Sequence, residues 1–168
     1  MGKLLKTGRT VRGADFISGR TSIWVGLGRT TPWAEELNPP DEAETATEIE
    51  EVFGLKLYTT ASHIVQDSSG PINFKGQKYR ILTLDEAYEQ KATDLYLEFE
   101  VQPDEFAEIS YRQIGVYVDA IPKPGFSGYT ALNPNRFDSL GKLIYLSNLT
   151  KQTRYPNTRH VIEVVIPG

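Results

Sequence analysis

The sequence predicts a mainly β protein, an antiparallel β-sandwich with an extended N-terminal arm and one or two short helices. Short segments with alternating apolar residues recur along the chain, and turns rich in glycine, proline and asparagine separate them. Aromatic residues make up 11% of the sequence, and aromatic side chains suit half-buried pleated surfaces. The length of 168 residues is enough for one ordinary domain with a sizeable core.

The expected elements follow from these patterns in chain order. Residues 1–21 hold four glycines among basic residues and are expected to form an extended basic arm. Residues 22–168 are expected to form a single β-rich domain, with an acidic loop or short helix at 30–54. One or two helical turns are expected at 85–92. The expected strands are 22–28, two pieces within 55–65, 77–84, 94–102, 112–120, 142–147 and 160–166.

The strand at 94–102 has the clearest alternation. One of its faces is apolar and is expected to be buried, whereas the other carries Glu98 and Glu100 and is expected to face solvent. The strand at 112–120 repeats the pattern. The core is therefore expected to include Leu95, Leu97, Phe99, Val101, Ile114, Val116 and Val118.

Charge is strongly segregated near the N-terminus. Residues 1–29 hold six lysines and arginines against one acid, whereas residues 30–52 hold eight acids and neither lysine nor arginine. This arrangement is compatible with an arm that binds nucleic acid, although we expect no nucleic-acid partner. It is equally compatible with two complementary patches that dock onto neighbouring subunits, or with a solvated tail and loop.

The residue types present favour a protein without enzymatic activity, cofactor or metal. There is no cysteine, only His63 and His160 are histidines, and no phosphate-binding or nucleophile motif occurs. Glu98 and Glu100 are interpreted as a sheet surface rather than as a glycosidase pair. No segment has the length and apolar character of a membrane span or secretory signal. An alternative is a carbohydrate-binding β-sandwich module that stacks sugars on Trp24 and Trp33.

Three segments resemble tailed-bacteriophage virion structural proteins, such as the baseplate wedge subunits of contractile tails. Residues 23–40, IWVGLGRTTPWAEELNPP, resemble an aromatic-Gly-Arg-x-x-Pro-Trp pattern that ends in Asn-Pro-Pro. Residues 111–117, YRQIGVY, resemble the family's central Arg-Gln-apolar-Gly strand. Residues 153–166 resemble its Arg-rich turn and closing strand. Ala34 and Leu37 depart from the more acidic or proline-containing version of the first pattern.

The resemblance implies a β-sandwich-like virion part without a cofactor, made in the host cytoplasm and placed in the tail or baseplate. Its partners would be other tail or baseplate proteins, or further copies in a symmetric assembly; a neck or tail-completion protein is the alternative. The loop at 31–40 is expected to be an assembly contact, because its prolines restrict the backbone and Trp33 offers a large apolar area. The alternative is that Trp33 folds back onto its own sheet and closes the edge of the core. The interface candidates are Arg9, Arg12, Arg20, Trp24, Pro32, Trp33, Pro39, Pro40, Arg112, Gln113 and Tyr117.

Overall fold

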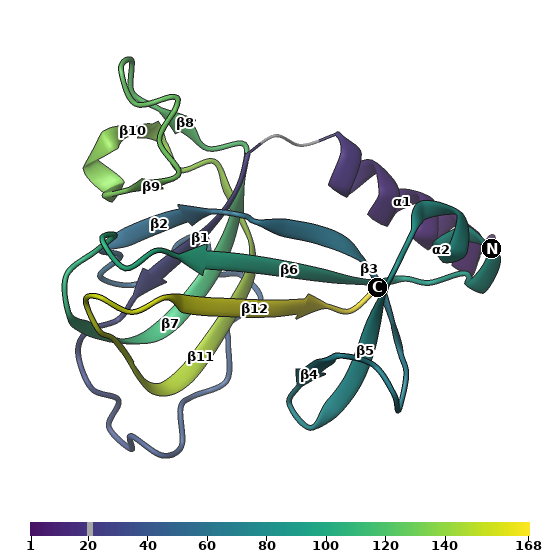
Figure 1. Cartoon of the computed structure of the whole chain (residues 1–168), viewed down its shortest axis with the longest axis horizontal. Coiled ribbons are helices and arrows are strands. Elements are labelled where there is room, and N and C mark those ends of the chain that lie inside the picture. The colour runs from purple at the N-terminus through teal and green to yellow at the C-terminus, as the bar shows by residue number, and fades with distance from the viewer. Residues whose placement is uncertain (20–21) are drawn as a thin grey trace. The chain divides into compact units, whose positions relative to one another are not determined.

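A computed structural model describes residues 1–19 and 22–168, and the chain divides into two compact units. Unit 1 contains residues 1–19, Thr59–Glu98 and Ile162–Gly168; unit 2 contains Ser22–Tyr58 and Phe99–Val161. Both units are built mainly from antiparallel strands, as Figure 1 shows, so the predicted mainly β class is confirmed. The division differs from the expected arm followed by one domain, because residues of the N-terminal segment pack within unit 1.

Unit 2 contains a five-stranded antiparallel sheet with the order β11-β7-β1-β2-β9. A two-stranded sheet of β8 and β10 and the short 3-10 helix η1 complete the unit. β11 is longer than the expected 142–147, because it continues through two register shifts along β7. The bounds are β1 Ile23–Gly28, β2 Gly54–Leu57, β7 Ile109–Val118, β8 Ile121–Pro122, β9 Ala131–Leu132, η1 Pro134–Arg136, β10 Phe137–Ser139 and β11 Lys142–Arg154.

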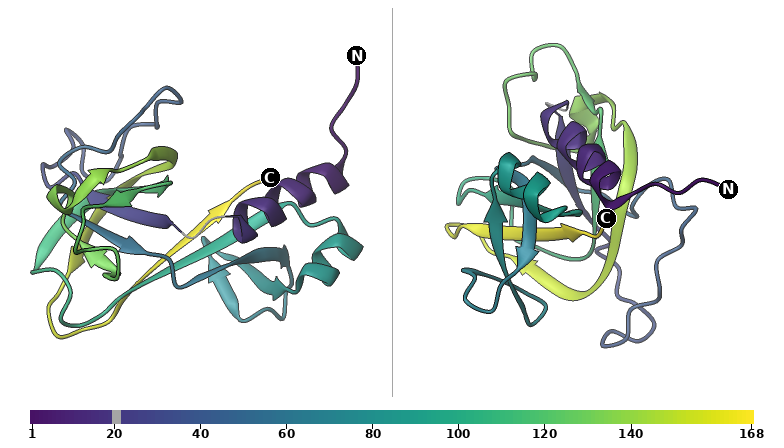
Figure 2. Two further views of the ribbon diagram at one scale, coloured as in Figure 1. Left: turned by 90° about the horizontal axis from the view of Figure 1, so that it is seen from above. Right: turned by 90° about the vertical axis from the view of Figure 1, so that its right-hand side faces the viewer.

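Unit 1 contains most of the second five-stranded sheet, with the order β12-β6-β3-β5-β4. β6 and β12 each contribute residues to both units. Two helices, α1 and α2, lie side by side near β3 (Figures 1 and 2). The bounds are α1 Lys6–Ser18, β3 Thr60–Gln66, β4 Ile72–Phe74, β5 Gln77–Leu82, α2 Leu84–Gln90, β6 Asp94–Val101 and β12 His160–Ile166.

The core residues predicted in β6 and β7 are all buried. The opposite faces of these strands differ from the expectation. Tyr96 and Tyr117 are each only 2% exposed, and Glu98 and Glu100 are half-buried rather than solvent-facing. Within unit 2, the reason is that the loop between β1 and β2 covers the second face of β7 at Tyr117.

Residues 6–18 form the helix α1 where an extended arm was expected. Thr10 is fully buried, and its hydroxyl donates to the Ala92 carbonyl at 2.7 Å. Gly13 and Ala14 are also buried and give the helix a flat contact face. Packing of this face therefore overrides the low helix propensity of the glycines.

The predicted helix at 85–92 is confirmed as α2, which begins at a capping box formed by Thr83 and Glu86. The alternative of a short acidic helix after Pro40 is not formed. Residues 41–53 are turns and irregular backbone. The backbone N–H groups of Ile49 and Glu50 donate to side chains of β7, so they are not available to a helical ladder.

Candidate assembly interface

The acidic loop, residues 30–52, is held on unit 2 by side chains of β7. Arg112 is buried, and its guanidinium donates to both carboxylate oxygens of Glu36, at 2.7 and 3.0 Å, and to the Thr30 carbonyl at 2.7 Å. The Gln113 side-chain carbonyl accepts from the Glu50 N–H at 2.7 Å. These bonds fix both ends of the loop, because Thr30 lies at its start and Glu50 near its end.

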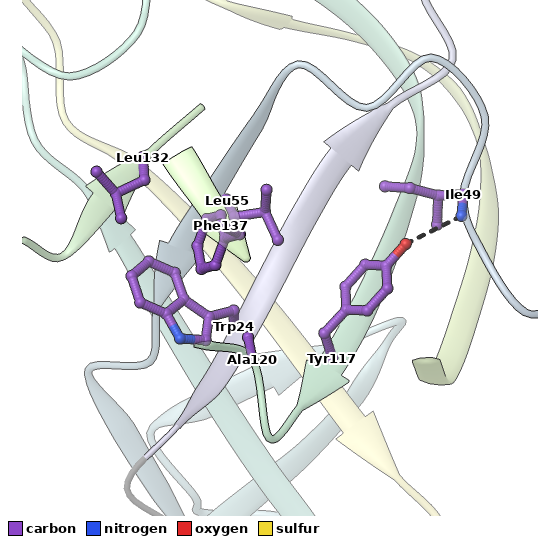
Figure 3. Close-up of a cluster of buried hydrophobic side chains, with 7 residues drawn as sticks. All are labelled: Trp24, Ile49, Leu55, Tyr117, Ala120, Leu132 and Phe137. Atoms are coloured by element: carbon purple, nitrogen blue, oxygen red, sulfur yellow. Dashed lines mark hydrogen bonds between the residues drawn. The ribbon is translucent and has the colours of Figure 1, made fainter. Parts of the chain in front are cut away.

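A notch made by two glycines receives the returning end of the loop. Gly26 in β1 and Gly115 in β7 are direct partners across the two strands. A Cβ atom at either position would lie 2.6–2.9 Å from a methyl group of Ile49, so only glycine leaves room for this side chain. The Tyr117 hydroxyl also accepts from the Ile49 N–H at 3.1 Å. Figure 3 shows this bond between two members of a buried cluster that also contains Trp24, Leu55 and Phe137.

The proline-containing part of the loop is held by β11. The Trp33 indole N–H donates to the Leu149 carbonyl at 2.8 Å, and the Arg29 guanidinium lies 4.0 Å from the centre of the Trp33 ring. Asn148 donates from its backbone N–H to Glu42 at 3.0 Å and from its side-chain amide to the Pro40 carbonyl at 2.9 Å. The loop is therefore fixed along its length by side chains and backbone groups of the sheet.

The eight carboxylates of the loop fall into two groups. Glu36, Glu42, Glu50 and Glu51 bind partners within unit 2. Hydrogen bonds from the Thr30 and Thr31 hydroxyls lower the pKa of Glu51. Among the described residues, Asp41, Glu44 and Glu48 are exposed and make no hydrogen bond or ion pair, and Glu35 has only a long contact from Asn38 at 3.5 Å. The free carboxylates of the fixed loop are therefore available to a partner.

The predicted interface residues lie in three different settings. Trp24 and Trp33 are 3% and 8% exposed, and Arg112, Gln113 and Tyr117 are also buried. These five side chains support the loop from within, and for Trp33 this matches the alternative in which the indole packs onto its own sheet. The physical reason is that each donates to or accepts from a group of the same unit.

Of the remaining predicted residues, Pro32 and Pro40 are exposed and Pro39 is half-buried in the loop. Arg9 and Arg12 lie on α1 in unit 1, where Arg12 is exposed. Arg20 lies outside the described residues. Sequence reasoning did not assign a role in holding the loop to Ile49, Gly115 or Asn148, and Asn148 lies just beyond the strand expected at 142–147.

Glu98 and His160, two of the titratable residues considered from the sequence, form hydrogen bonds with tyrosine side chains. The Tyr96 hydroxyl lies 2.9 Å from Glu98 and 2.8 Å from Glu163, and burial, followed by these carboxylates, raises its pKa. His160 forms a 2.6 Å hydrogen bond with the Tyr111 hydroxyl, and burial lowers its pKa. Among residues 1–19 and 22–168, no three His, Asp or Glu side chains gather in a way that could hold a metal ion. In the same residues, no helix is long and apolar enough to cross a membrane.

Comparison with known proteins gives two matches. The family described as "Baseplate wedge 3 tail fiber network component" matches residues 1–167. "Virion protein 3" of Enterococcus phage phiEF24C is 30% identical to this chain over 139 residues, which cover 79% of the chain and 76% of that relative. The family match extends through the acidic loop and the strands that hold it.

Proposed function

Because the chain belongs to the family of baseplate wedge 3 tail fiber network components, we propose that it is a non-enzymatic wedge subunit of a contractile phage tail. The chain is a virion structural protein of a bacteriophage, located in the tail. The finer assignment rests on one observation: a long acidic loop is fixed on the sheet of unit 2 while Asp41, Glu44 and Glu48 remain free. Such a surface fits a contact with basic partner proteins.

A fixed loop favours association because little conformational entropy is lost when it binds. Arg112, Gln113 and Tyr117 hold the loop from below, and Pro39 and Pro40 restrict its backbone. Free carboxylates on such a loop direct basic partners and disfavour acidic ones. The loop at 31–40 thus keeps its proposed role as an assembly contact, with Trp33 as its internal support.

The alternative of a carbohydrate-binding module receives less support. Trp24 and Trp33 were the candidate stacking platforms, and neither ring is exposed. Sugar stacking needs an open aromatic face. The free carboxylates of the acidic loop fit a contact between proteins, as in a wedge or neck protein, and have no role in the stacking of sugars on Trp24 and Trp33.

The proposal is tested by complementing a phage that lacks this gene and measuring the protein in purified particles by mass spectrometry. The test variant carries Asp41→Asn, Glu44→Gln and Glu48→Gln. The control carries Glu89→Gln, Glu108→Gln and Asp138→Asn, which removes the same charge from other exposed positions. We expect equal thermal stability but reduced incorporation of the loop variant alone. Equal incorporation of both variants would exclude the loop as the contact, and labelling away from the baseplate in cryo-electron microscopy would exclude the wedge assignment.

A further inference from the structure

A groove of about 250 Å³ lies between the acidic loop and β11 in unit 2. Apolar residues of both elements line it, together with Glu42 and Glu44 of the acidic loop. The bond from the Asn148 N–H to Glu42 fixes one wall against the other. Small-molecule sites usually measure about 300–1,000 Å³, so this groove better suits a few side chains of a protein partner. The lining residues are Glu42, Ala43, Glu44, Ala46, Leu143, Ile144, Tyr145 and Leu146.

The groove follows an open edge of the sheet. β11 is the terminal strand in the order of unit 2, and four consecutive residues of it, 143–146, line the groove. Successive side chains of a strand point to opposite faces, so a groove that reaches all four follows the strand edge. A register shift lies between Leu143 and Tyr145, and Ile144 between them is 45% exposed. An edge of this kind accepts an extended segment from another chain.

Residues 3–6 have the matching chemistry. Leu4 and Leu5 are 43% and 70% exposed, and Leu5 has the extended backbone angles φ −75° and ψ 163°. Lys3 and Lys6 flank the leucines and, among the described residues, form no ion pair. The first turn of α1 contains no acidic residue, so the positive end of this helix lies beside Lys6 without a compensating charge.

We propose that the groove beside β11 binds residues 3–6 of a second copy of this chain. Leu4 and Leu5 cover the apolar lining, while Lys3 and Lys6 pair with Glu42 and Glu44. Residues 3–5 precede α1 and span about 10 Å when extended, so they fit along the roughly 13 Å of the four β11 residues that line the groove. The inference rests on the proposed function and deepens it, because it names a partner for the acidic loop.

The contact joins two different surfaces, because each copy offers one groove and one basic segment. Two copies can exchange them reciprocally about a two-fold axis, or repetition of the contact can produce a ring or an open chain of copies.

Disulfide crosslinking tests the contact directly, because the sequence contains no cysteine. Two purified full-length variants, Leu5→Cys and Ala43→Cys, are mixed and oxidised. We expect a disulfide-linked dimer that contains one of each, and much less of it when Ser127→Cys, also exposed in unit 2, replaces Ala43→Cys. Equal yields from both mixtures would overturn the proposal. A variant that carries both Leu5→Cys and Ala43→Cys is oxidised in the same way. A disulfide that forms only within single chains of this variant would overturn the assignment to a second copy.

A charge exchange provides the second measurement, by sedimentation velocity at low and high salt. Glu44 is exposed and unpaired among the described residues, so Glu44→Lys is expected to preserve folding. We expect it to weaken self-association at least about tenfold at low salt, and Lys3→Glu with Lys6→Glu to restore much of the loss. Absence of restoration would contradict the assigned pairing. These measurements use purified protein, so their failure would leave the particle test of the wedge function unaffected.

Discussion

In each unit, a segment outside the sheet packs on it and covers part of it: the acidic loop in unit 2 and α1 in unit 1. These two covering segments are held by different kinds of contact. In unit 2, the acidic loop is fixed by buried side chains of β7 and by Asn148 of β11. In unit 1, α1 is held by the Thr10 hydroxyl and by contact of Gly13 with His63, where a Cβ atom would lie 2.6 Å from Nε2. The cover of unit 2 is therefore specified by directional bonds, and that of unit 1 mainly by shape.

Buried polar atoms that lack a hydrogen bond also differ between the two units. Among the described residues, Arg9 Nε, Ser62 Oγ and His63 Nε2 of unit 1 are buried without a well-formed hydrogen bond. Arg29 Nε is the corresponding atom of unit 2, but its other nitrogens bind Glu50 and Pro32. An unpaired buried polar group costs about 1–3 kcal/mol. We therefore expect α1 to separate from its sheet more readily than the acidic loop does.

The largest effect is expected from Arg154→Met in unit 2. Arg154 is fully buried, and its guanidinium donates to backbone carbonyls in two turns, including Gln102 at 2.8 Å and Thr158 at 2.8 Å. Methionine would leave these carbonyls unpaired, so the free energy of unfolding should fall by about 3–5 kcal/mol in urea titrations. Arg159→Met is the control, because Arg159 is mostly exposed and should cost under about 1 kcal/mol. Equal losses would show that burial of Arg154 is not what stabilises the turns.

A smaller effect is expected from Gly115→Val in the glycine notch. The added side chain would displace Ile49 and Leu143, each of which would lie 2.6 Å from the new Cβ. Overpacking of this kind costs about 1–3 kcal/mol, and cleavage of the acidic loop by protease should become faster. Gly128→Val is the control, because no atom lies within 4 Å of a Cβ at that position. Unchanged cleavage in Gly115→Val would show that the notch does not hold the loop.

The sequence was informative where one strand pattern decided the outcome. Alternation placed the buried residues of β6 and β7, and the helical turns expected at 85–92 are present as α2. The sequence was uninformative where a contact joins residues that lie far apart along the chain. Nothing local shows that Ile49 fills a notch between Gly26 and Gly115, or that tertiary packing makes residues 6–18 helical. For the same reason, the sequence marked Arg112 and Gln113 as interface candidates but did not reveal their bonds to the acidic loop.

Acid is expected to loosen α1 of unit 1 while leaving the acidic loop of unit 2 in place. Burial lowers the pKa of His63 below its ordinary value of 6.5, and the backbone of Thr10 partly offsets this. The unfolded chain therefore binds the proton first, so stability is complete above pH 6.5 and falls as the pH decreases toward the folded pKa. The slope is at most about 1.4 kcal/mol per pH unit for each such histidine.

Hydrogen exchange measured at pH 7.5 and 5.0 should show faster opening of α1 at the lower pH, with little change at the amides of Ile49 and Glu50. His63→Gln should reduce this pH dependence. His160→Gln is the matched comparison, because burial also lowers the pKa of His160 but this residue lies in unit 2. An unchanged response of α1 in His63→Gln would remove His63 as its cause.

The smallest effect is expected from Thr83→Ala at the start of α2. The Thr83 hydroxyl accepts from the Glu86 N–H at 3.2 Å, and the Thr83 N–H donates to the Glu86 carboxylate at 3.0 Å. Alanine removes the first bond, so the free energy of unfolding should fall by about 0.5–2 kcal/mol. The loss stays small because α2 has only seven residues, and Leu84 and Tyr88 remain exposed on it. Thr47→Ala, at an exposed position of the acidic loop, should change nothing. If Thr83→Ala destabilises the chain as much as Gly115→Val does, then local caps hold unit 1 as strongly as the notch holds the acidic loop, and the contrast between the two covers fails.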